Sequence, residues 1–201
     1  VAPRSLDETV DWAKNFGRYS YFTIHTLQKR SAILALASAV AALKPQTVLE
    51  IGTARGGTLL IWSSLAAQRV ISCDLVHRAA QKPLLEALPP PGSTCRVQLL
   101  TGNSHDAAFK QRVAQELAGQ KVDFLFIDGD HTESGVAADY RDYREFVRPG
   151  GIIAFHDIIE NQPLPDNQVY HFCKQVKQGQ KVEEFVNDPK QCGFGIGIIR
   201  V

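Results

Sequence analysis

The fold is decided by the stretch Val48-Leu49-Glu50-Ile51-Gly52-Thr53-Ala54-Arg55-Gly56-Gly57, in which an apolar strand runs directly into a glycine-bearing turn and then a helix. Gly52 removes the Cβ where the chain must turn tightly, and Gly56 and Gly57 permit close backbone approach as the helix begins. The dinucleotide fingerprint G-x-G-x-x-G is not matched, because Ala54 stands at its second glycine. The stretch therefore predicts a ligand-binding turn, with a tight turn that binds nothing as the alternative.

Beyond Pro45, short apolar runs alternate with helical stretches. Seven strands are predicted, over residues 47–51, 69–73, 96–101, 122–127, 151–155, 181–186 and 195–201. Stretches long enough for crossover helices separate the first five, which requires parallel pairing with right-handed connections. The link between the last two is too short for a crossover, so they should form an antiparallel hairpin. We therefore expect an α/β fold, a Rossmann-like doubly wound sheet that is mostly parallel with a C-terminal antiparallel hairpin.

Two helices are predicted ahead of the first strand, from Ser5 to Phe16 and from about Thr23 to Leu43. We expect residues 1–22 to form an N-terminal helical cover and residues 23–201 to form one domain. With 201 residues and 44% hydrophobic content, the chain can bury one substantial core but is too short for two full α/β domains.

Charge and composition narrow the kind of partner. Lys and Arg number 22 against 21 Asp and Glu, so no overall field draws the protein toward nucleic acid or an anionic membrane. The sequence contains no apolar run long enough for a membrane span, and its four cysteines form no CxxC pair. We expect a cytoplasmic protein that binds a small molecule, without nucleic-acid or membrane partners, and the sequence leaves a homodimer open.

Polar side chains at the ends of the first three strands indicate a nucleoside ligand. Glu50 would repel a pyrophosphate but suits the ammonium and sulfonium charges of S-adenosylmethionine. Asp74 lies 22 residues beyond Gly52, where a carboxylate reaches ribose hydroxyls, although it also suits a helix N-cap. Asn103 and Ser104 follow the third strand and either bracket an adenine edge or cap a helix.

The fourth and fifth strands deliver ionisable groups to the same edge of the sheet. Asp128, Asp130 and His131 follow the fourth strand, and His156 and Asp157 follow the fifth. Crowded carboxylates repel and need a cation or a shared proton, which favours function over capping. The trio of Asp128, His156 and Asp157 is a candidate site for magnesium or a transition metal. A hydrogen-bonded His–Asp pair that only orders the loop is the alternative.

Other features receive simpler interpretations. The loop over residues 162–167 carries two prolines at the carboxyl end of the sheet and is a candidate substrate lid. His25, His77, His105 and His171 show no partner pattern and are expected to be surface or packing residues.

Taken together, these motifs resemble class I S-adenosylmethionine-dependent methyltransferases. Within that class the chain is similar to the group of small bacterial O-methyltransferases and cephalosporin hydroxylase-like proteins, and more distantly to catechol O-methyltransferases. The resemblance runs from about Thr23 to Val201 and rests on VLEIGTARGGT, the strand ending in Asp74, FLFIDGDHTESGVAADY and VRPGGIIAFHDI. The combination is specific, whereas any single motif is not.

The resemblance implies a methionine site at the first turn, a ribose site at Asp74 and an adenine site after the third strand. The implied cofactor residues are Glu50, Gly52, Thr53, Ala54, Gly57, Asp74, Asn103, Ser104 and Asp128. In catechol-type relatives, an acid after the fourth strand and an Asp-Asn pair after the fifth hold magnesium. Asp128 matches the acid, but His156-Asp157 replaces the pair. The family's lysine near the fourth-strand acid is missing, and His131 is its nearest substitute.

The prediction is an S-adenosylmethionine-dependent O-methyltransferase acting on a small-molecule hydroxyl, with a divalent metal at Asp128, His156 and Asp157. The candidate catalytic residues are Asp128, His131 and His156, with either histidine as general base. Three alternatives stay open. The first is an iron-dependent hydroxylase-type enzyme, suggested by a histidine beside two carboxylates. The others are a nicotinamide-dependent oxidoreductase and a non-catalytic cofactor-binding module.

Overall fold

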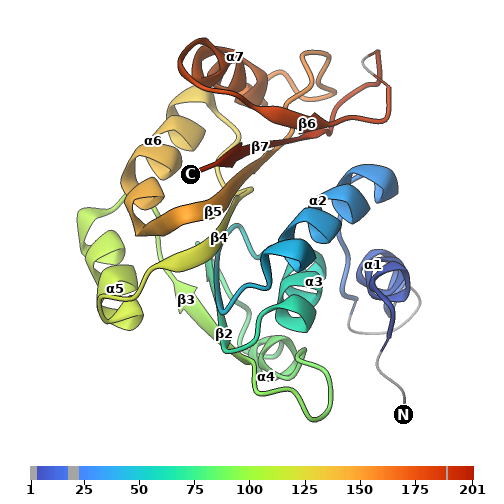
Figure 1. Cartoon of the computed structure of the whole chain (residues 1–201), viewed down its shortest axis with the longest axis vertical. Coiled ribbons are helices and arrows are strands. Elements are labelled where there is room, and N and C mark those ends of the chain that lie inside the picture. The colour runs from blue at the N-terminus through green and yellow to red at the C-terminus, as the bar shows by residue number, and fades with distance from the viewer. Residues whose placement is uncertain (1–3, 18–22, 189) are drawn as a thin grey trace.

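Figure 1 shows a computed structural model of the chain, which describes residues 4–17, 23–188 and 190–201. A seven-stranded sheet runs through its centre in the order β3-β2-β1-β4-β5-β7-β6. The strands are β1 Thr47–Ile51, β2 Arg69–Asp74, β3 Arg96–Thr101, β4 Val122–Ile127, β5 Val147–His156, β6 Glu183–Phe185 and β7 Ile196–Arg200. The first five pair in parallel, and β7 is antiparallel to both β5 and β6. The predicted fold class is confirmed.

Helices cover both faces of the sheet (Figure 1). They are α1 Leu6–Asn15, α2 Arg30–Leu43, α3 Gly57–Leu65, α4 Lys82–Glu86, α5 Ala107–Leu117, α6 Glu133–Tyr143 and α7 Val169–Gly179, with a 3-10 turn at Arg144–Phe146. Side chains alternate along the buried strands, so Phe124 and Phe126 pack under α2 and α3 while Leu125 and Ile127 pack under α5 to α7. The sheet therefore separates two apolar cores.

Strand boundaries differ from the prediction mainly in β5, which was expected over residues 151–155. The strand begins earlier because Val147 already pairs with Val122, and a register shift follows before Phe124 pairs with Ile152. Such a bulge bends the strand without ending the ladder. At the other end β5 extends through His156, which places that side chain at the carboxyl edge of the sheet.

The segment over residues 23–29, here named the strap, is where the sequence prediction was wrong. A helix was expected from Thr23, but α2 begins only at Arg30, after Lys29 in an extended conformation. The strap bonds to α1 instead: the Ile24 amide donates to the Phe16 carbonyl and the Thr26 amide to the Ala13 carbonyl. Those contacts outweigh the helix-favouring composition, and β-branched residues also suit an extended chain.

The N-terminal cover is partly visible. Residues 1–3 and 18–22 of that predicted segment lie outside the described residues. In the part that is described, α1 buries Val10 and Ala13 in the same core as Ile33 and Leu36 of α2. Helix α1 therefore supports the strap from within the main core.

We expect Ser5→Ala to lower the free energy of unfolding by about 1 kcal/mol, because Ser5 forms a capping box at the start of α1. Its hydroxyl accepts from the Glu8 amide at 3.2 Å, and the Glu8 carboxylate accepts from the Ser5 amide at 2.7 Å. Urea denaturation would measure the change. Ser38→Ala is the control, since that exposed hydroxyl donates to the Leu34 carbonyl within α2 and caps no helix end. Equal effects would contradict the cap.

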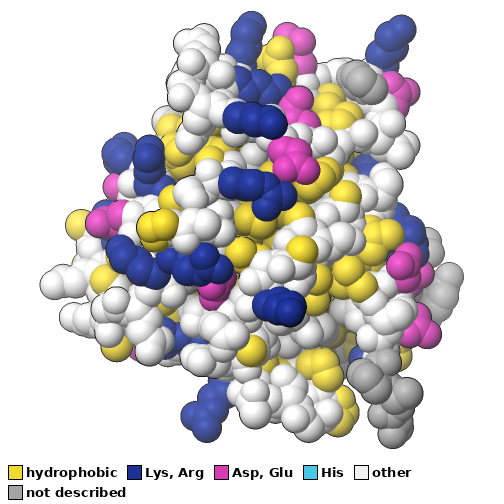
Figure 2. Space-filling view, viewed as in Figure 1, with side chains coloured by type: hydrophobic (Ala, Val, Ile, Leu, Met, Phe, Trp, Pro, Cys, Tyr) yellow, Lys and Arg dark blue, Asp and Glu magenta, His cyan; other side chains and the backbone are white. Residues whose placement is uncertain are grey.

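The outer surface is mixed in charge. Figure 2 shows Lys and Arg side chains scattered over one face, with Asp and Glu beside several of them, in keeping with a formal net charge of +1. Among the helices of the described ranges, none is both long and apolar enough to cross a membrane.

Candidate functional site

A pocket of about 970 Å³ lies at the carboxyl edge of the parallel strands, within the size range of small-molecule sites. Its walls come from the strap, the β1–α3 turn, the loops after β2, β3, β4 and β5, and the loop before β7. The sequence-predicted residues that line it are Gly52, Thr53, Ala54, Asp74, Asn103, Ser104, Asp128, His131, His156 and Asp157. Parts of the loop over residues 162–167, the predicted lid, line it as well.

The glycine turn and the loop after β4 touch through Gly52. Its φ of +99° belongs to glycine, and a Cβ there would lie 2.1 Å from the Asp128 carbonyl oxygen. The Gly52 amide also donates to the Cys73 carbonyl at 2.8 Å. The turn is thus locked between β2 and β4, which brings the predicted cofactor turn next to Asp128.

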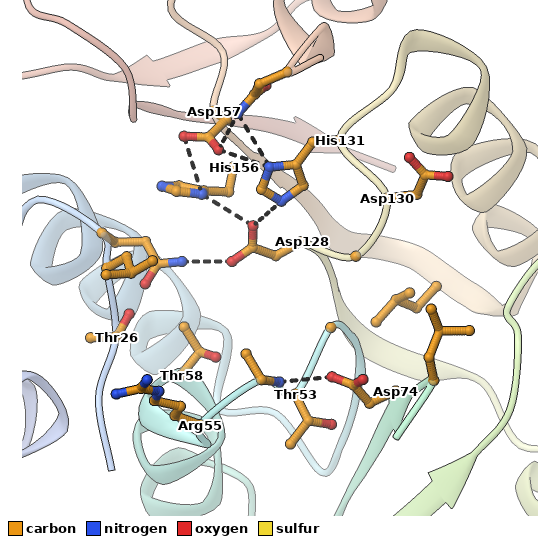
Figure 3. Close-up of a pocket in the computed structure, with 18 of the residues that line it drawn as sticks. Thr26, Thr53, Arg55, Thr58, Asp74, Asp128, Asp130, His131, His156 and Asp157 are labelled. Carbon is orange, nitrogen blue, oxygen red and sulfur yellow. Dashed lines mark hydrogen bonds and ion pairs between the residues drawn. The ribbon is translucent and has the colours of Figure 1, made fainter. Parts of the chain in front are cut away.

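Asp74 orders the same turn from the end of β2. Its carboxylate accepts from the Ala54 amide at 2.8 Å and from the Val76 amide at 3.2 Å. Figure 3 shows the Asp74 side chain beside Thr53, across the pocket from Asp128. The residue therefore holds the turn in place and also presents a half-buried carboxylate to the pocket.

Glu50 and Gly57 do not line the pocket. Glu50 is fully buried beneath it, and its carboxylate accepts from the Ser72 hydroxyl at 2.5 Å. Ser72 in turn lies 2.6 Å from the hydroxyl of Thr53, which does line the pocket. Burial raises the pKa of Glu50 to about 7, against the opposing effect of the Ser72 hydrogen bond. Glu50 can influence a ligand by charge through the pocket floor, but not by direct contact.

This raised pKa makes stability depend on pH. The folded state holds the Glu50 proton more tightly than the unfolded state does. The stability that this proton contributes is therefore present below pH 4.5 and is lost as pH rises to about 7. As pH rises from 4.5 to 8, we expect the free energy of unfolding of Glu50→Gln to increase by about 3 kcal/mol relative to that of the wild type. Urea denaturation across that range would measure it, with Glu116→Gln as a control on α5. Parallel pH profiles of wild type and Glu50→Gln would contradict the assignment.

The ionisable groups after β4 and β5 meet as one cluster, which we define as Asp128, His131, His156 and Asp157 (Figure 3). His131 Nε2 lies 3.2 Å from Asp128 Oδ1, and its Nδ1 lies 3.1 Å from Asp157 Oδ2. His156 Nδ1 lies 3.1 Å from Asp128 Oδ1 and 3.4 Å from Asp157 Oδ1. The neighbouring Asp130 points away from the cluster and accepts from the amide of Thr132, the N-cap residue of α6. Two carboxylates thus share two imidazoles.

The cluster sets the protonation of its own members. Hydrogen bonds to Asp128 and then to Asp157 raise the pKa of His131 to about 10. Burial opposes the charge of Asp128, yet His156 and His131 together keep its pKa below the ordinary value. Burial likewise opposes the charge on His156, but Asp128 outweighs it and the pKa is raised. At neutral pH the cluster therefore contains ionised carboxylates beside at least one imidazolium, that of His131.

Asp157 is held in an unusual conformation by the surrounding loops. Its φ is +65°, in the left-handed region that non-glycine residues rarely adopt. The Phe194 amide donates to Asp157 Oδ1 at 3.1 Å, and the Asn167 amide group donates to Oδ2 at 2.6 Å. The predicted lid loop and the loop before β7 thereby fix this carboxylate against the two histidines.

Sequence reasoning missed several residues of the site. Thr26 and Gln28 of the strap line the pocket, although they were placed on a helix. Of the histidines expected to be surface or packing residues, His25 and His105 also line it, and His77 lies 3.0 Å from the Thr53 hydroxyl. A single sequence gives no spacing signal for these positions, because they reach the site from loops.

Comparisons with known proteins agree with this geometry. The methyltransferase domain family matches residues 49–158, which is more than half of the chain and includes both the glycine turn and the cluster. A curated relative, an uncharacterised protein of Acanthamoeba polyphaga mimivirus, is 32% identical over 114 residues. That match covers 55% of this chain, and the chain spans about half the length of the relative, 51%.

Solved structures share the fold. An O-methyltransferase from Bacillus cereus in complex with SAH superposes with a TM-score of 0.66 and 16% identity, covering 100% of this chain and 93% of that one. The MycE methyltransferase of the mycinamycin biosynthetic pathway, in complex with Mg and SAH, gives a TM-score of 0.62 and 18% identity, covering 99% and 55%. Similarity at this level establishes the architecture alone.

Proposed function

This chain belongs to the methyltransferase domain family and has the fold of S-adenosylmethionine-dependent methyltransferases, and we propose that it methylates a hydroxyl group of a small molecule. One observation carries the choice of an oxygen acceptor. The cluster of Asp128, His131, His156 and Asp157 faces the same pocket as the glycine turn and Asp74. A proton-accepting cluster opposite a cofactor turn is what methyl transfer to a hydroxyl requires.

We propose that the two sides of the pocket have separate tasks. The turn at Gly52, Thr53 and Ala54 and the carboxylate of Asp74 would hold the methionine and ribose parts of the cofactor. Asn103 and Ser104 would bracket the adenine. When bound, S-adenosylmethionine supplies the methyl group as an electrophilic sulfonium substituent. The acceptor would lie against the cluster, where His131 is partly exposed.

The protonation of the cluster suggests how the hydroxyl is activated. His131, with a pKa of about 10, already carries its proton and is better suited to stabilise negative charge on the acceptor oxygen than to remove a proton. Asp128 remains ionised, and its Oδ2, which among the described residues accepts from the Gln28 amide alone, would take the hydroxyl proton as the new oxygen–carbon bond forms. This proposal replaces the base predicted at His131 or His156 with Asp128. Loops around Asp157 would exclude water and hold the geometry.

The residues predicted to bind a divalent metal do not form an open ligand set. Every carboxylate oxygen of Asp128 and Asp157 already faces a histidine nitrogen or an amide N–H. Within the described ranges, no three His, Cys, Asp or Glu side chains are arranged to hold a metal ion. We derive no step through a metal, and metal binding stays a prediction for titration to test.

Calorimetric titration of metal-stripped protein with S-adenosylhomocysteine tests the proposal, first alone and then with magnesium or manganese added. We expect micromolar binding in both conditions with equal affinity. A metal-dependent gain in affinity would bring the predicted metal site back into the mechanism. Failure to bind in either condition would contradict the proposed function and favour the iron-dependent or nicotinamide-dependent alternatives.

A further inference from the structure

Two side chains of the strap carry buried polar atoms that no group in the described part of the chain satisfies. Thr26 and Gln28 are each only 3% exposed, and both line the pocket. The hydroxyl oxygen of Thr26 and the amide oxygen of Gln28 have no hydrogen-bond partner among the described residues. Because leaving a buried polar atom unpaired is costly, such atoms in a pocket wall indicate a ligand that pairs with them.

The orientation of the Gln28 amide shows what kind of ligand group this is. Its nitrogen donates to Asp128 Oδ2 at 2.6 Å, and an ionised carboxylate can only accept. The amide oxygen is therefore the free atom, and it can only accept. The missing partner must be a donor. An ammonium group, with three N–H donors and a positive charge near Asp128, meets that requirement best.

The N-terminus of helix α3 lies beside the strap that carries these acceptors. The strap crosses the first turn of α3 so closely that a Cβ on Gly57 would lie 2.4 Å from the Thr26 nitrogen. Helix α3 begins after Gly56 with no side-chain cap, so its first N–H groups lack intrahelical partners and favour an anion. Figure 3 shows Thr26 and Thr58 on the same side of the pocket. Acceptors for a cation thus adjoin donors for an anion.

We propose that Thr26 and Gln28 bind the α-ammonium group of the cofactor's amino-acid end, while the start of α3 binds its carboxylate. This inference rests on the proposed function, because it assigns new residues to the same cofactor site. The extended strap, held by its hydrogen bonds to the Ala13 and Phe16 carbonyls, lays the backbone of His25 and Thr26 against Gly57. This gives Gly57 a role in admitting the strap, without any contact to the ligand.

Gln28 has a second consequence as a positioning residue. One planar amide would accept from the ammonium through its oxygen and donate to Asp128 through its nitrogen. Cofactor binding would thereby fix the Gln28 side chain and, through it, the carboxylate that serves the acceptor.

The test pairs two ligands with two variants. Calorimetry would compare S-adenosylhomocysteine with its desamino analogue, in which hydrogen replaces the amino group. The variants are Thr26→Val and Gln28→Met, which keep side-chain size but remove the acceptor oxygen. Gln28→Met also removes the N–H that donates to Asp128, a loss that both ligands would report equally. Thr9→Val and Gln98→Met are matched controls outside the pocket, because the Thr9 hydroxyl donates to the Ser5 carbonyl and the Gln98 amide donates to Glu116.

We expect Gln28→Met to weaken S-adenosylhomocysteine binding about tenfold, and Thr26→Val to act in the same direction, with little change for the desamino analogue. The ratio of the affinities for S-adenosylhomocysteine and its desamino analogue should thus fall in the two variants and stay at the wild-type value in the controls. Equal weakening of both ligands, or no weakening, would overturn the assignment while leaving the proposed function intact. A wild type that binds neither ligand would instead overturn the proposed function, and this inference with it.

Discussion

Gly52→Ala is expected to lower the affinity for S-adenosylhomocysteine by at least about a hundredfold, equivalent to about 3 kcal/mol. The new methyl group would lie 2.1 Å from the Asp128 carbonyl oxygen and 2.9 Å from the Gly129 nitrogen. Both are backbone atoms between a buried strand and the site, so neither can move aside as a flexible side chain would. The φ of +99° adds conformational strain for any residue with a Cβ.

Calorimetry would measure this loss, and thermal unfolding would show whether the sheet survives. Gly119→Ala is the matched control, because Gly119 also has a positive φ, +79°, but nothing lies within 4 Å of its would-be Cβ. The control measures the backbone strain alone, worth about 1–2 kcal/mol, and so separates it from the clash with the loop after β4. Equal effects of the two substitutions on ligand affinity would show that close packing at Gly52 is unimportant.

The sheet was predictable because its central strands are buried on both faces. Runs such as residues 122–127 contain little but large apolar side chains, and such runs have few other stable environments. The connections between the first five strands are long enough for crossover helices, which predicted parallel pairing, and the short link before β7 predicted the antiparallel hairpin. The β5 bulge was not predictable, since it depends on how Val147 and Ile152 pair with β4.

Residues of the candidate site were predictable only where they directly follow a strand. Asp74, Asp128 and His156 follow directly from strand ends, because parallel strands end at one edge of the sheet. The strap was not, because its composition suits a helix and its actual partners, Ala13 and Phe16, come from a different helix. Local propensity is a weak prior that such tertiary hydrogen bonds override.

Glu50 shows a different limit. The sequence places this carboxylate beside the glycine turn, and it does lie there, but beneath the pocket and fully buried. Alternation along β1 determines which face the side chain occupies, whereas its depth depends on Ser72 and the residues packed above it. A prediction of direct ligand contact therefore becomes one of electrostatic influence.

Asp128→Ala should reduce methyl transfer by about 10²- to 10⁴-fold, the range for losing a proton-transfer group, with only modest loss of cofactor affinity. The carboxylate is the common partner of His131, His156 and Gln28. Its removal leaves the Gln28 amide N–H without this acceptor and leaves Asp157 as the carboxylate that both imidazoles still contact. Radiolabelled S-adenosylmethionine would measure transfer to the first hydroxyl compound that the wild type methylates.

The isosteric variant decides what Asp128 contributes. If its charge accepts the hydroxyl proton, Asp128→Asn should be as inactive as Asp128→Ala, although it keeps the size of the side chain. Asp142→Asn is the control, since that carboxylate lies on the outer face of α6 beside Arg141. Substantial activity in Asp128→Asn would return the base to His131 or His156, because only the shape of residue 128 would then matter. Parallel loss of turnover and of S-adenosylhomocysteine affinity would instead make Asp128 a cofactor-binding residue, since its contact with Gln28 would serve binding alone.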